Sequence, residues 1–131
     1  MPTTKYEGAK PTQVRIQEKP FGGLTPGELV VVPSPMDVER ALWQIPVGQT
    51  NSQPELRRAL ADQHDADNAC PAMTGFQLRY VAEVAVEALE AGAAPGEVAP
   101  FWRVIDPGSK IAGRLPNGAE LIAELRKNDR L

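Results

Sequence analysis

Proline constrains this sequence more than any other residue, because its fixed φ angle and missing N–H begin or end regular structure wherever it occurs. Thirteen of the 131 residues are proline, which is about twice the usual frequency. Five of them fall within residues 1–34, which also contain Gly22–Gly23 and show no helical periodicity. We therefore expect an extended N-terminal arm over residues 1–34 and one globular domain over residues 35–131.

The arm contains one apolar stretch and an excess of positive charge. Glu28–Val32 is mostly β-branched and lies between Pro26–Gly27 and Pro33, which predicts a short strand or an extended clamp on the core. Residues 3–19 carry four basic and two acidic side chains. Such a segment is typical of a disordered tail or a docking arm, so the arm is a candidate site for a protein partner.

The next prolines mark two helices. Ser34 is a suitable N-cap before Pro35, and the helix that follows should stop at Pro46. Ser52 and Glu55 have the spacing of a capping box, which predicts a second helix starting after Ser52.

The second half of the domain contains the longest predicted helix, which opens at Cys70–Pro71 and stops at Gly92. Phe101–Ile105 and Lys110–Leu115 then predict a small β hairpin. A last helix follows Pro116–Gly118. The order helix, helix, helix, hairpin, helix is that of a winged helix-turn-helix domain, so we expect a mainly α domain of this type.

The composition excludes several classes of site. With one cysteine, Cys70, and one histidine, His64, the chain has neither an internal disulfide nor the four ligands of a structural zinc site. No run of about 18 apolar residues and no signal-peptide pattern occur. We therefore expect a cytoplasmic protein with no membrane contact, no metal and no other cofactor.

Three short motifs give the domain a resemblance to a known family. Ile45–Gly48 reads Ile-Pro-Val-Gly, Cys70–Gly75 reads Cys-Pro-Ala-Met-Thr-Gly, and Pro100–Val104 reads Pro-Phe-Trp-Arg-Val. Residues 36–129 thereby resemble the DNA-binding domain of O6-alkylguanine-DNA alkyltransferases and alkyltransferase-like proteins. In that family the first helix ends in Ile-Pro-x-Gly, and the active-site strand reads Pro-Cys-His-Arg-Val. The Cys-Pro-x-x-Thr-Gly motif is similar to that of a bacterial subgroup lacking the active-site cysteine.

The resemblance implies a DNA-binding protein whose third helix enters a groove, with O6-alkylguanine as a candidate lesion. The implied DNA contacts lie near the starts of the second and third helices: Ser52, Gln53, Thr74, Gly75, Phe76, Gln77 and Arg79. The implied lesion pocket, beside any flipped base, consists of Phe101, Trp102 and Arg103.

The sequence also departs from the family pattern. Phe101–Trp102 stands where the family has its cysteine nucleophile and the adjacent histidine, and phenylalanine cannot form a thiolate, so alkyl transfer at this position is excluded. Gln53 replaces a usual tyrosine but can still hydrogen-bond a phosphate. Arg79 lies about one turn after the family's intercalating arginine, which leaves Phe76 or Met73 as candidate wedges between bases.

Charge argues against DNA binding by the helices as a whole. Residues 74–91 carry Arg79 against three glutamates, and residues 52–68 also have a net charge of −2. A DNA-facing surface is usually basic. Cations would have to come from Lys5, Lys10, Arg15, Lys19, Lys110 and Arg114. Binding should then be weak and sensitive to salt.

The candidate sites also have structural interpretations. Phe101 and Trp102 can fill the core, and we expect Trp43 to be a core residue or a hydrophobic staple. Thr74–Gly75 can serve close packing instead of anion binding. Cys70 can be a buried residue at a loop-to-helix junction. In the alternative reading it is a thiolate nucleophile at a helix N-terminus.

Two other functions therefore stand beside DNA binding. One is a protein-interaction or scaffolding domain on the same fold, which joins a partner or a second copy through the arm or through Glu28–Val32. The other, which we expect least, is a thiol enzyme in which Cys70 is the nucleophile and His64 its base.

Overall fold

In the computed structural model, which describes residues 5–130, the chain is mainly helical and has a small three-stranded sheet. The α-helices are α1 (Pro35–Trp43), α2 (Gln53–Gln63), α3 (Pro71–Glu90) and α4 (Gly118–Asn128). The strands are β1 (Gln13–Ile16), β2 (Leu29–Val32) and β3 (Asn68–Ala69). Three 3₁₀ turns complete the structure: η1 (Pro95–Glu97), η2 (Phe101–Arg103) and η3 (Ala112–Arg114).

The helix starts predicted from proline and capping residues are confirmed. The Ser34 hydroxyl accepts a hydrogen bond from the Asp37 N–H at 3.1 Å, and Pro35 is the first residue of α1. At α2, the Glu55 N–H donates to the Ser52 hydroxyl and the Ser52 N–H donates to the Glu55 carboxylate, which completes the capping box. These bonds satisfy amides that a helix start otherwise leaves unpaired.

The sheet is built largely from the arm. β2 is the central strand, and it pairs antiparallel with β1 and parallel with β3. The predicted strand over Glu28–Val32 is confirmed as β2, whose Val30 and Val31 are fully buried. β1 is the outer strand beside β2, and all four of its residues are exposed, so it forms an open edge of the sheet.

The hairpin predicted over Phe101–Ile105 and Lys110–Leu115 is wrong. Each of these segments contains a 3₁₀ turn, η2 in the first and η3 in the second. All five residues of Phe101–Ile105 are buried, a pattern that does not suit a half-exposed antiparallel strand. Local hydrogen bonds close the turn instead, from the Val104 N–H to the Phe101 carbonyl at 3.1 Å. The antiparallel strand pair of the described residues is β1–β2.

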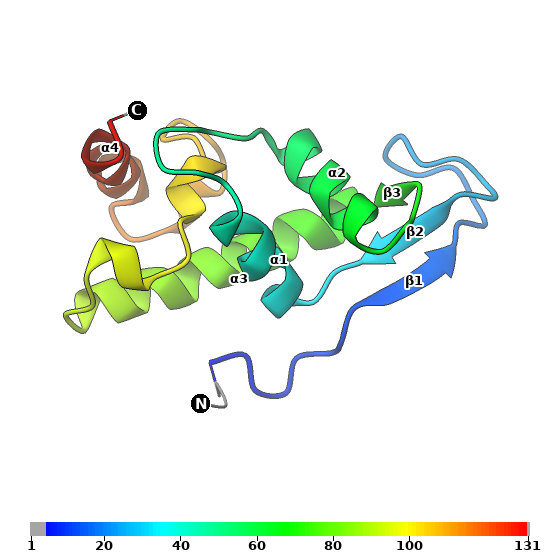
Figure 1. Ribbon diagram of the computed structural model, residues 1–131, viewed down its shortest axis with the longest axis horizontal. Coiled ribbons are helices and arrows are strands. Elements are labelled where there is room, and N and C mark those ends of the chain that lie inside the picture. Colours follow the sequence, from blue (N-terminus) through cyan, green and yellow to red (C-terminus); the bar gives the residue numbers. More distant parts are fainter. Residues whose placement is uncertain (1–4, 131) are drawn as a thin grey trace.

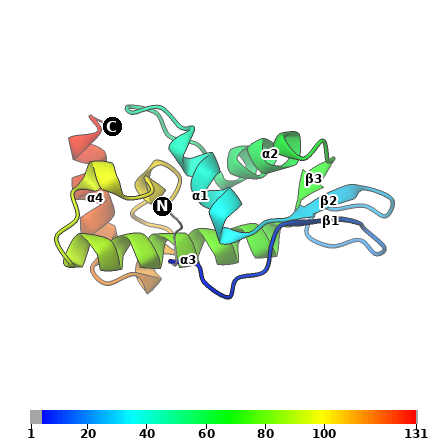
Figure 2. The same cartoon turned by 60° about the horizontal axis from the view of Figure 1, so that its bottom comes forward.

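The helices are arranged along α3, which runs through most of the length of the molecule (Figures 1 and 2). The sheet lies at the N-terminal end of α3, and α4 lies at its other end. Between them, α1 packs on α3 and α2 packs on β3. Buried side chains from each of these elements meet in one core that includes Leu42, Leu60, Leu78, Val81 and Phe101.

Gly118 allows a close contact between the loop around η3 and the start of α4. A Cβ atom on Gly118 would lie 1.9 Å from the Ala112 carbonyl oxygen, so the loop around η3 can pack on the start of α4 only because residue 118 is glycine. Trp43 was expected as a core residue or a staple, and the core placement is wrong: Trp43 is 44% exposed and its side chain donates a hydrogen bond to Glu39.

Candidate nucleic-acid interface

A groove of about 420 Å³ lies where the start of α2, the first turns of α3 and the loop around η3 meet; we call it the α3 groove. The residues that line it include Gln53, Gly75, Phe76, Arg79, Lys110 and Arg114. The fold thus brings four of the seven sequence-predicted DNA contacts to one place. It adds two cations from a loop that was predicted to be part of a hairpin.

The lining of the α3 groove is basic, although the whole chain has a net charge of −3. Lys110 and Arg114 are exposed. The third cation, Arg79, forms a long ion pair with Glu83, with 3.7 Å between its Nε atom and the carboxylate. None of the described residues that line the groove is an aspartate or a glutamate.

Two helix starts add to this positive potential. The first residue of α2, Gln53, and the first residue of α3, Pro71, both line the α3 groove. The first turn of α3 contains no acidic residue, and the Cys70 side chain makes no capping hydrogen bond there. A helix N-terminus carries a partial positive charge and free N–H groups, which favour a phosphate.

The other predicted DNA contacts lie elsewhere. Thr74 is fully buried, and within the described residues its hydroxyl has no hydrogen-bond partner, so the prediction that it contacts DNA is wrong. Ser52 is exposed but does not line the groove, and its hydroxyl is engaged in the capping box. Gln77 lines a neighbouring pocket on the arm side of α3.

The predicted lesion pocket is not a pocket. The exposed fractions of Phe101, Trp102 and Arg103 are 0%, 2% and 7%, so the three side chains fill the interior. The rings of Phe101 and Trp102 meet edge to face, with 5.3 Å between their centroids. This arrangement agrees with the core-filling interpretation and contradicts a site open to a flipped base.

Asp129, at the end of α4, holds two of these side chains. Its carboxylate accepts hydrogen bonds from Trp102 Nε1 at 2.8 Å and from Arg103 Nε at 2.6 Å. Arg103 also donates to the Ile45 carbonyl at 2.8 Å, which ties η2 to the residues that follow α1. Burial alone would raise the pKa of the Asp129 carboxyl, but the bonds from Arg103 and Trp102 and the Arg103 charge lower that pKa below its ordinary value.

Sequence reasoning missed Asp129. The available signal was Arg103 itself, because an arginine inside an apolar run is rarely buried without a partner. Nothing in the sequence identified which of the acidic residues would be that partner.

The structure does not bring together the residues of the predicted thiol site. Cys70 is 3% exposed and lies in a small cluster with Leu24 and Val30. His64 Nε2 lies 3.1 Å from the Asp37 carboxylate, on the α1 side of the molecule. Among residues 5–130, no group of three or more histidine, cysteine or carboxylate side chains has the geometry of a metal site.

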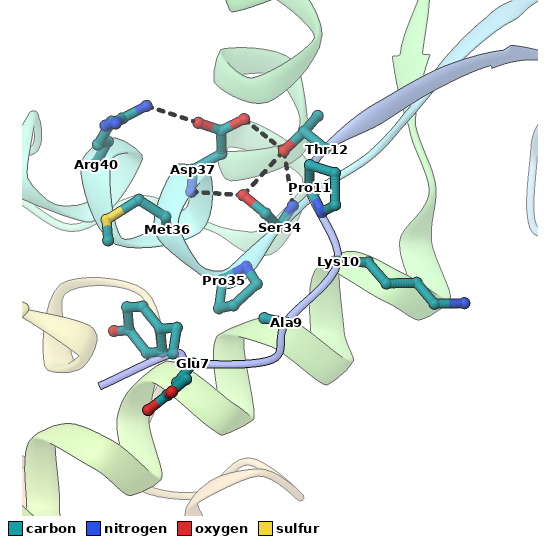
Figure 3. Close-up of a pocket in the computed structure, with 11 residues that line it drawn as sticks. Glu7, Ala9, Lys10, Pro11, Thr12, Ser34, Pro35, Met36, Asp37 and Arg40 are labelled. Carbon is teal, nitrogen blue, oxygen red and sulfur yellow. Dashed lines mark hydrogen bonds and ion pairs between the residues drawn. The ribbon is translucent and has the colours of Figure 1, made fainter. Parts of the chain in front are cut away.

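A second cavity, of about 540 Å³, lies between the arm and α1 (Figure 3). Part of its polar wall is a network of hydrogen bonds among Thr12, Ser34, Asp37 and Arg40. The Thr12 hydroxyl accepts from the Ser34 N–H at 2.8 Å and donates to Asp37 at 2.5 Å, and Arg40 also donates to Asp37. Because these groups satisfy one another, they serve to fix the arm to the start of α1 rather than to recognise a ligand.

A second attachment fixes the beginning of the described arm. The Tyr6 hydroxyl donates to Glu39, whose carboxylate also pairs with Lys5 at 2.9 Å and accepts from Trp43. Burial would raise the pKa of Glu39, but these three donors lower it. The pKa of the Tyr6 phenol is raised, first by burial and then by its bond to Glu39.

Comparisons with models of known protein families, with curated proteins and with solved structures found no match to this chain. Across the described residues, no helix combines the length and the apolar character needed to cross a lipid bilayer.

Proposed function

We propose that this protein binds DNA through the α3 groove, with α2 and α3 acting as a helix-turn-helix pair, and that it does not transfer alkyl groups. The observation that carries the proposal is the concentration of Arg79, Lys110 and Arg114 in a groove to which residues 5–130 contribute no carboxylate. DNA affinity comes mainly from neutralising phosphates, so a basic groove at two helix starts is the feature that DNA binding requires.

The acidic character of the helices is compatible with this orientation. Glu83, Glu87 and Glu90 are exposed, and they lie in the second half of α3, beyond the residues that line the groove. Approach by the N-terminal end of α3 therefore places the phosphates beside the cations and away from Glu87 and Glu90, whereas Glu83 pairs with Arg79 and competes with a phosphate for that side chain. Three cations are few, so the affinity should be modest, and log K should fall with log salt with a slope of about −2.7 for three neutralised phosphates.

Phe76 supports contact with bases as well as with phosphates. It is 58% exposed at the rim of the α3 groove, although large apolar side chains are usually buried. Apolar side chains in such positions insert between base steps in other DNA-binding proteins.

The absence of alkyl transfer follows from chemistry. Phe101 supplies no nucleophile, and Cys70 is buried away from the groove lining. O6-alkylguanine remains a candidate ligand through the family resemblance, and the buried Phe101–Arg103 segment is not where we place it. A cytoplasmic location is part of this proposal.

The test is a fluorescence anisotropy titration with a labelled duplex, unmodified or carrying one O6-methylguanine, at 50 and 200 mM salt. We expect binding to both duplexes that weakens at the higher salt, with both recovered unaltered, because no alkyl group is removed. Absence of a salt-dependent anisotropy change with either duplex would refute the proposal.

One observation favours a second candidate function. Val14 and Ile16, on the edge strand β1, are 45% and 65% exposed, and Leu29, opposite Ile16 on the central strand β2, is 41% exposed. Exposed apolar side chains beside an unpaired strand edge are typical of an interaction surface, which corresponds to a protein-interaction or scaffolding role. Light scattering distinguishes the two: a concentration-dependent dimer that Ile16→Lys abolishes supports this role, and a strict monomer with intact DNA binding counts against it.

A further inference from the structure

A pocket of about 260 Å³ lies between the arm and α3, directly beside the α3 groove; we call it the arm pocket. Phe76 lines both, so the two are separated by one exposed ring. The arm pocket is lined on the α3 side by Met73, Phe76, Gln77 and Tyr80, and on the arm side by residues that include Lys10 and Gln13.

We propose that the arm pocket holds one unpaired nucleobase of the DNA bound in the α3 groove. This inference rests on the proposed function and adds a ligand class and a second site to it.

The faces of a base are matched by aromatic rings. Phe76 and Tyr80 are four residues apart on α3 and therefore lie on the same side of the helix. Both line the arm pocket, and the Met73 side chain lies one turn before them. Stacking on such rings stabilises an unpaired base whatever its identity, because every base has a π face.

The polar edge of a base is matched by two free amides. Within residues 5–130, the side chains of Gln13 and Gln77 take part in no hydrogen bond, and both line the arm pocket from opposite walls. An amide side chain offers a donor and an acceptor together, which is the combination that base edges require. Lys10 supplies a cation, and no carboxylate lies among the lining residues that the structure describes.

The walls of the pocket are held in place before any ligand binds. The Tyr80 ring packs edge to face on Tyr6, with 5.6 Å between centroids, and Tyr6 is fixed by Glu39. The arm wall is fixed by Thr12, and Figure 3 shows the Lys10 side chain directed away from the Thr12–Ser34–Asp37 network. A pre-formed site loses little conformational entropy on binding.

The continuity of the two sites favours a base of bound DNA over an unrelated small molecule. The cations of the α3 groove place the DNA backbone on one side of Phe76, and the arm pocket opens on the other side. A base that leaves the stack at this point needs only to pass one exposed aromatic ring. Sites that receive such bases use the same combination of stacking and edge hydrogen bonds.

The experiment compares two labelled duplexes that differ only in one unpaired thymine. We expect the wild-type protein to bind the duplex with the unpaired thymine about tenfold more tightly than the fully paired one, because stacking of a single base on aromatic side chains supplies an effect of this order. In the double variant Gln13→Ala/Gln77→Ala the ratio of the two affinities should fall at least threefold. Arg114→Ala, in the α3 groove, should weaken both complexes and leave the ratio unchanged.

A second readout is independent of affinity. Permanganate oxidises unstacked thymines, so saturating wild-type protein should protect the unpaired thymine, as should saturating Arg114→Ala, whereas the double variant should not. Equal affinity of the wild type for both duplexes, or an unchanged ratio and protection in the double variant, would overturn the base site and leave the proposed function standing. Failure of the wild type to bind either duplex would overturn both.

Discussion

Two segments of this protein combine aromatic and cationic side chains, and the structure uses them in opposite ways. In Phe101–Arg103 the side chains are at most 7% exposed, and the guanidinium is bound by Asp129 and by the Ile45 carbonyl. In Phe76–Arg79 the phenylalanine is 58% exposed, and the arginine lines a groove with two further cations. From the family resemblance both segments were candidate DNA contacts, with core filling as the alternative for Phe101 and Trp102.

The difference shows that residue type does not define a binding site unless the groups are free to bind. An arginine that is already paired inside the protein contributes stability, whereas exposed cations in an open groove, such as Lys110 and Arg114, contribute affinity for an anion. The same distinction separates the closed Thr12–Ser34–Asp37 network from the free amides of Gln13 and Gln77. The following experiments test it, from the largest expected effect to the smallest.

Asp129→Ala should cause the largest loss of stability. Removal of one partner from a buried ion pair leaves the other charge uncompensated, which typically costs about 3–5 kcal/mol. Glu124→Ala is the matched control, because Glu124 is an exposed carboxylate on the same helix and should change the free energy of unfolding by less than about 0.5 kcal/mol. Urea denaturation measures the free energy of unfolding of both variants. A loss below about 1 kcal/mol in Asp129→Ala would contradict a closed, stabilising network around Arg103.

Two glycine substitutions should act in opposite directions. Gly118→Ala places a methyl group 1.9 Å from the Ala112 carbonyl oxygen, and steric conflicts of this kind cost about 1–3 kcal/mol. Gly75→Ala places its methyl group 3.8 Å from Gln53, an ordinary contact, and should raise stability by about 0.5–1 kcal/mol through helix propensity. Thermal unfolding of the two variants should shift the melting temperature down and up, respectively. Destabilisation by Gly75→Ala would show that the α3 groove is tighter than described.

Phe76→Ala should weaken DNA binding about fivefold, as expected for the loss of roughly 1 kcal/mol of contact, and should leave stability nearly unchanged. Trp43 provides the comparison, since its side chain is also exposed, at 44%, and lines neither the α3 groove nor the arm pocket. Trp43→Ala should therefore bind DNA like the wild type in the same anisotropy assay. If both variants lose affinity equally, the aromatic contact is not specific to the groove.

Glu39→Gln should have the smallest effect at neutral pH, about 1 kcal/mol or less for altered hydrogen bonding. The pH dependence of the free energy of unfolding of this variant is more informative. The pKa of Glu39 is lowered in the folded protein, so its ionised form contributes stability above the unfolded pKa of about 4.3. That contribution is lost as the pH falls through the lowered folded-state pKa.

The variant should consequently show a shallower fall in the free energy of unfolding below about pH 4 than the wild type. The residual slope should come partly from Asp129, whose pKa is lowered as well. Identical acid denaturation curves for the wild type and Glu39→Gln would contradict the role of Glu39 in attaching the arm.

Much of the helical architecture was predictable because its signals are local. Proline, serine caps and the capping box at Ser52 fixed the starts of α1, α2 and α3 within a few residues. The strand over Glu28–Val32 followed from β-branched residues between turn signals. These rules concern neighbouring residues only, so they do not depend on the rest of the fold.

The failures have a common physical cause, which is that burial depends on contacts distant in sequence. Phe101–Ile105 has the composition of a strand, but it folds as a buried turn that Asp129 and the Ile45 carbonyl hold through Trp102 and Arg103. Trp43 has the composition of a core residue and lies outside. The groove was half predictable: the starts of α2 and α3 were identified, whereas the positions of Lys110 and Arg114 depended on the close packing at Gly118.

The most direct test of the central claim, that DNA binds at the α3 groove, is a pair of charge reversals measured by anisotropy with one labelled duplex at low salt. Arg114→Glu and Lys127→Glu change the net charge equally, and both side chains are exposed, but only Arg114 lines the groove. We predict that Arg114→Glu weakens binding at least tenfold and that Lys127→Glu changes it less than twofold. Equal effects of the two substitutions, or no effect of Arg114→Glu, would contradict the claim.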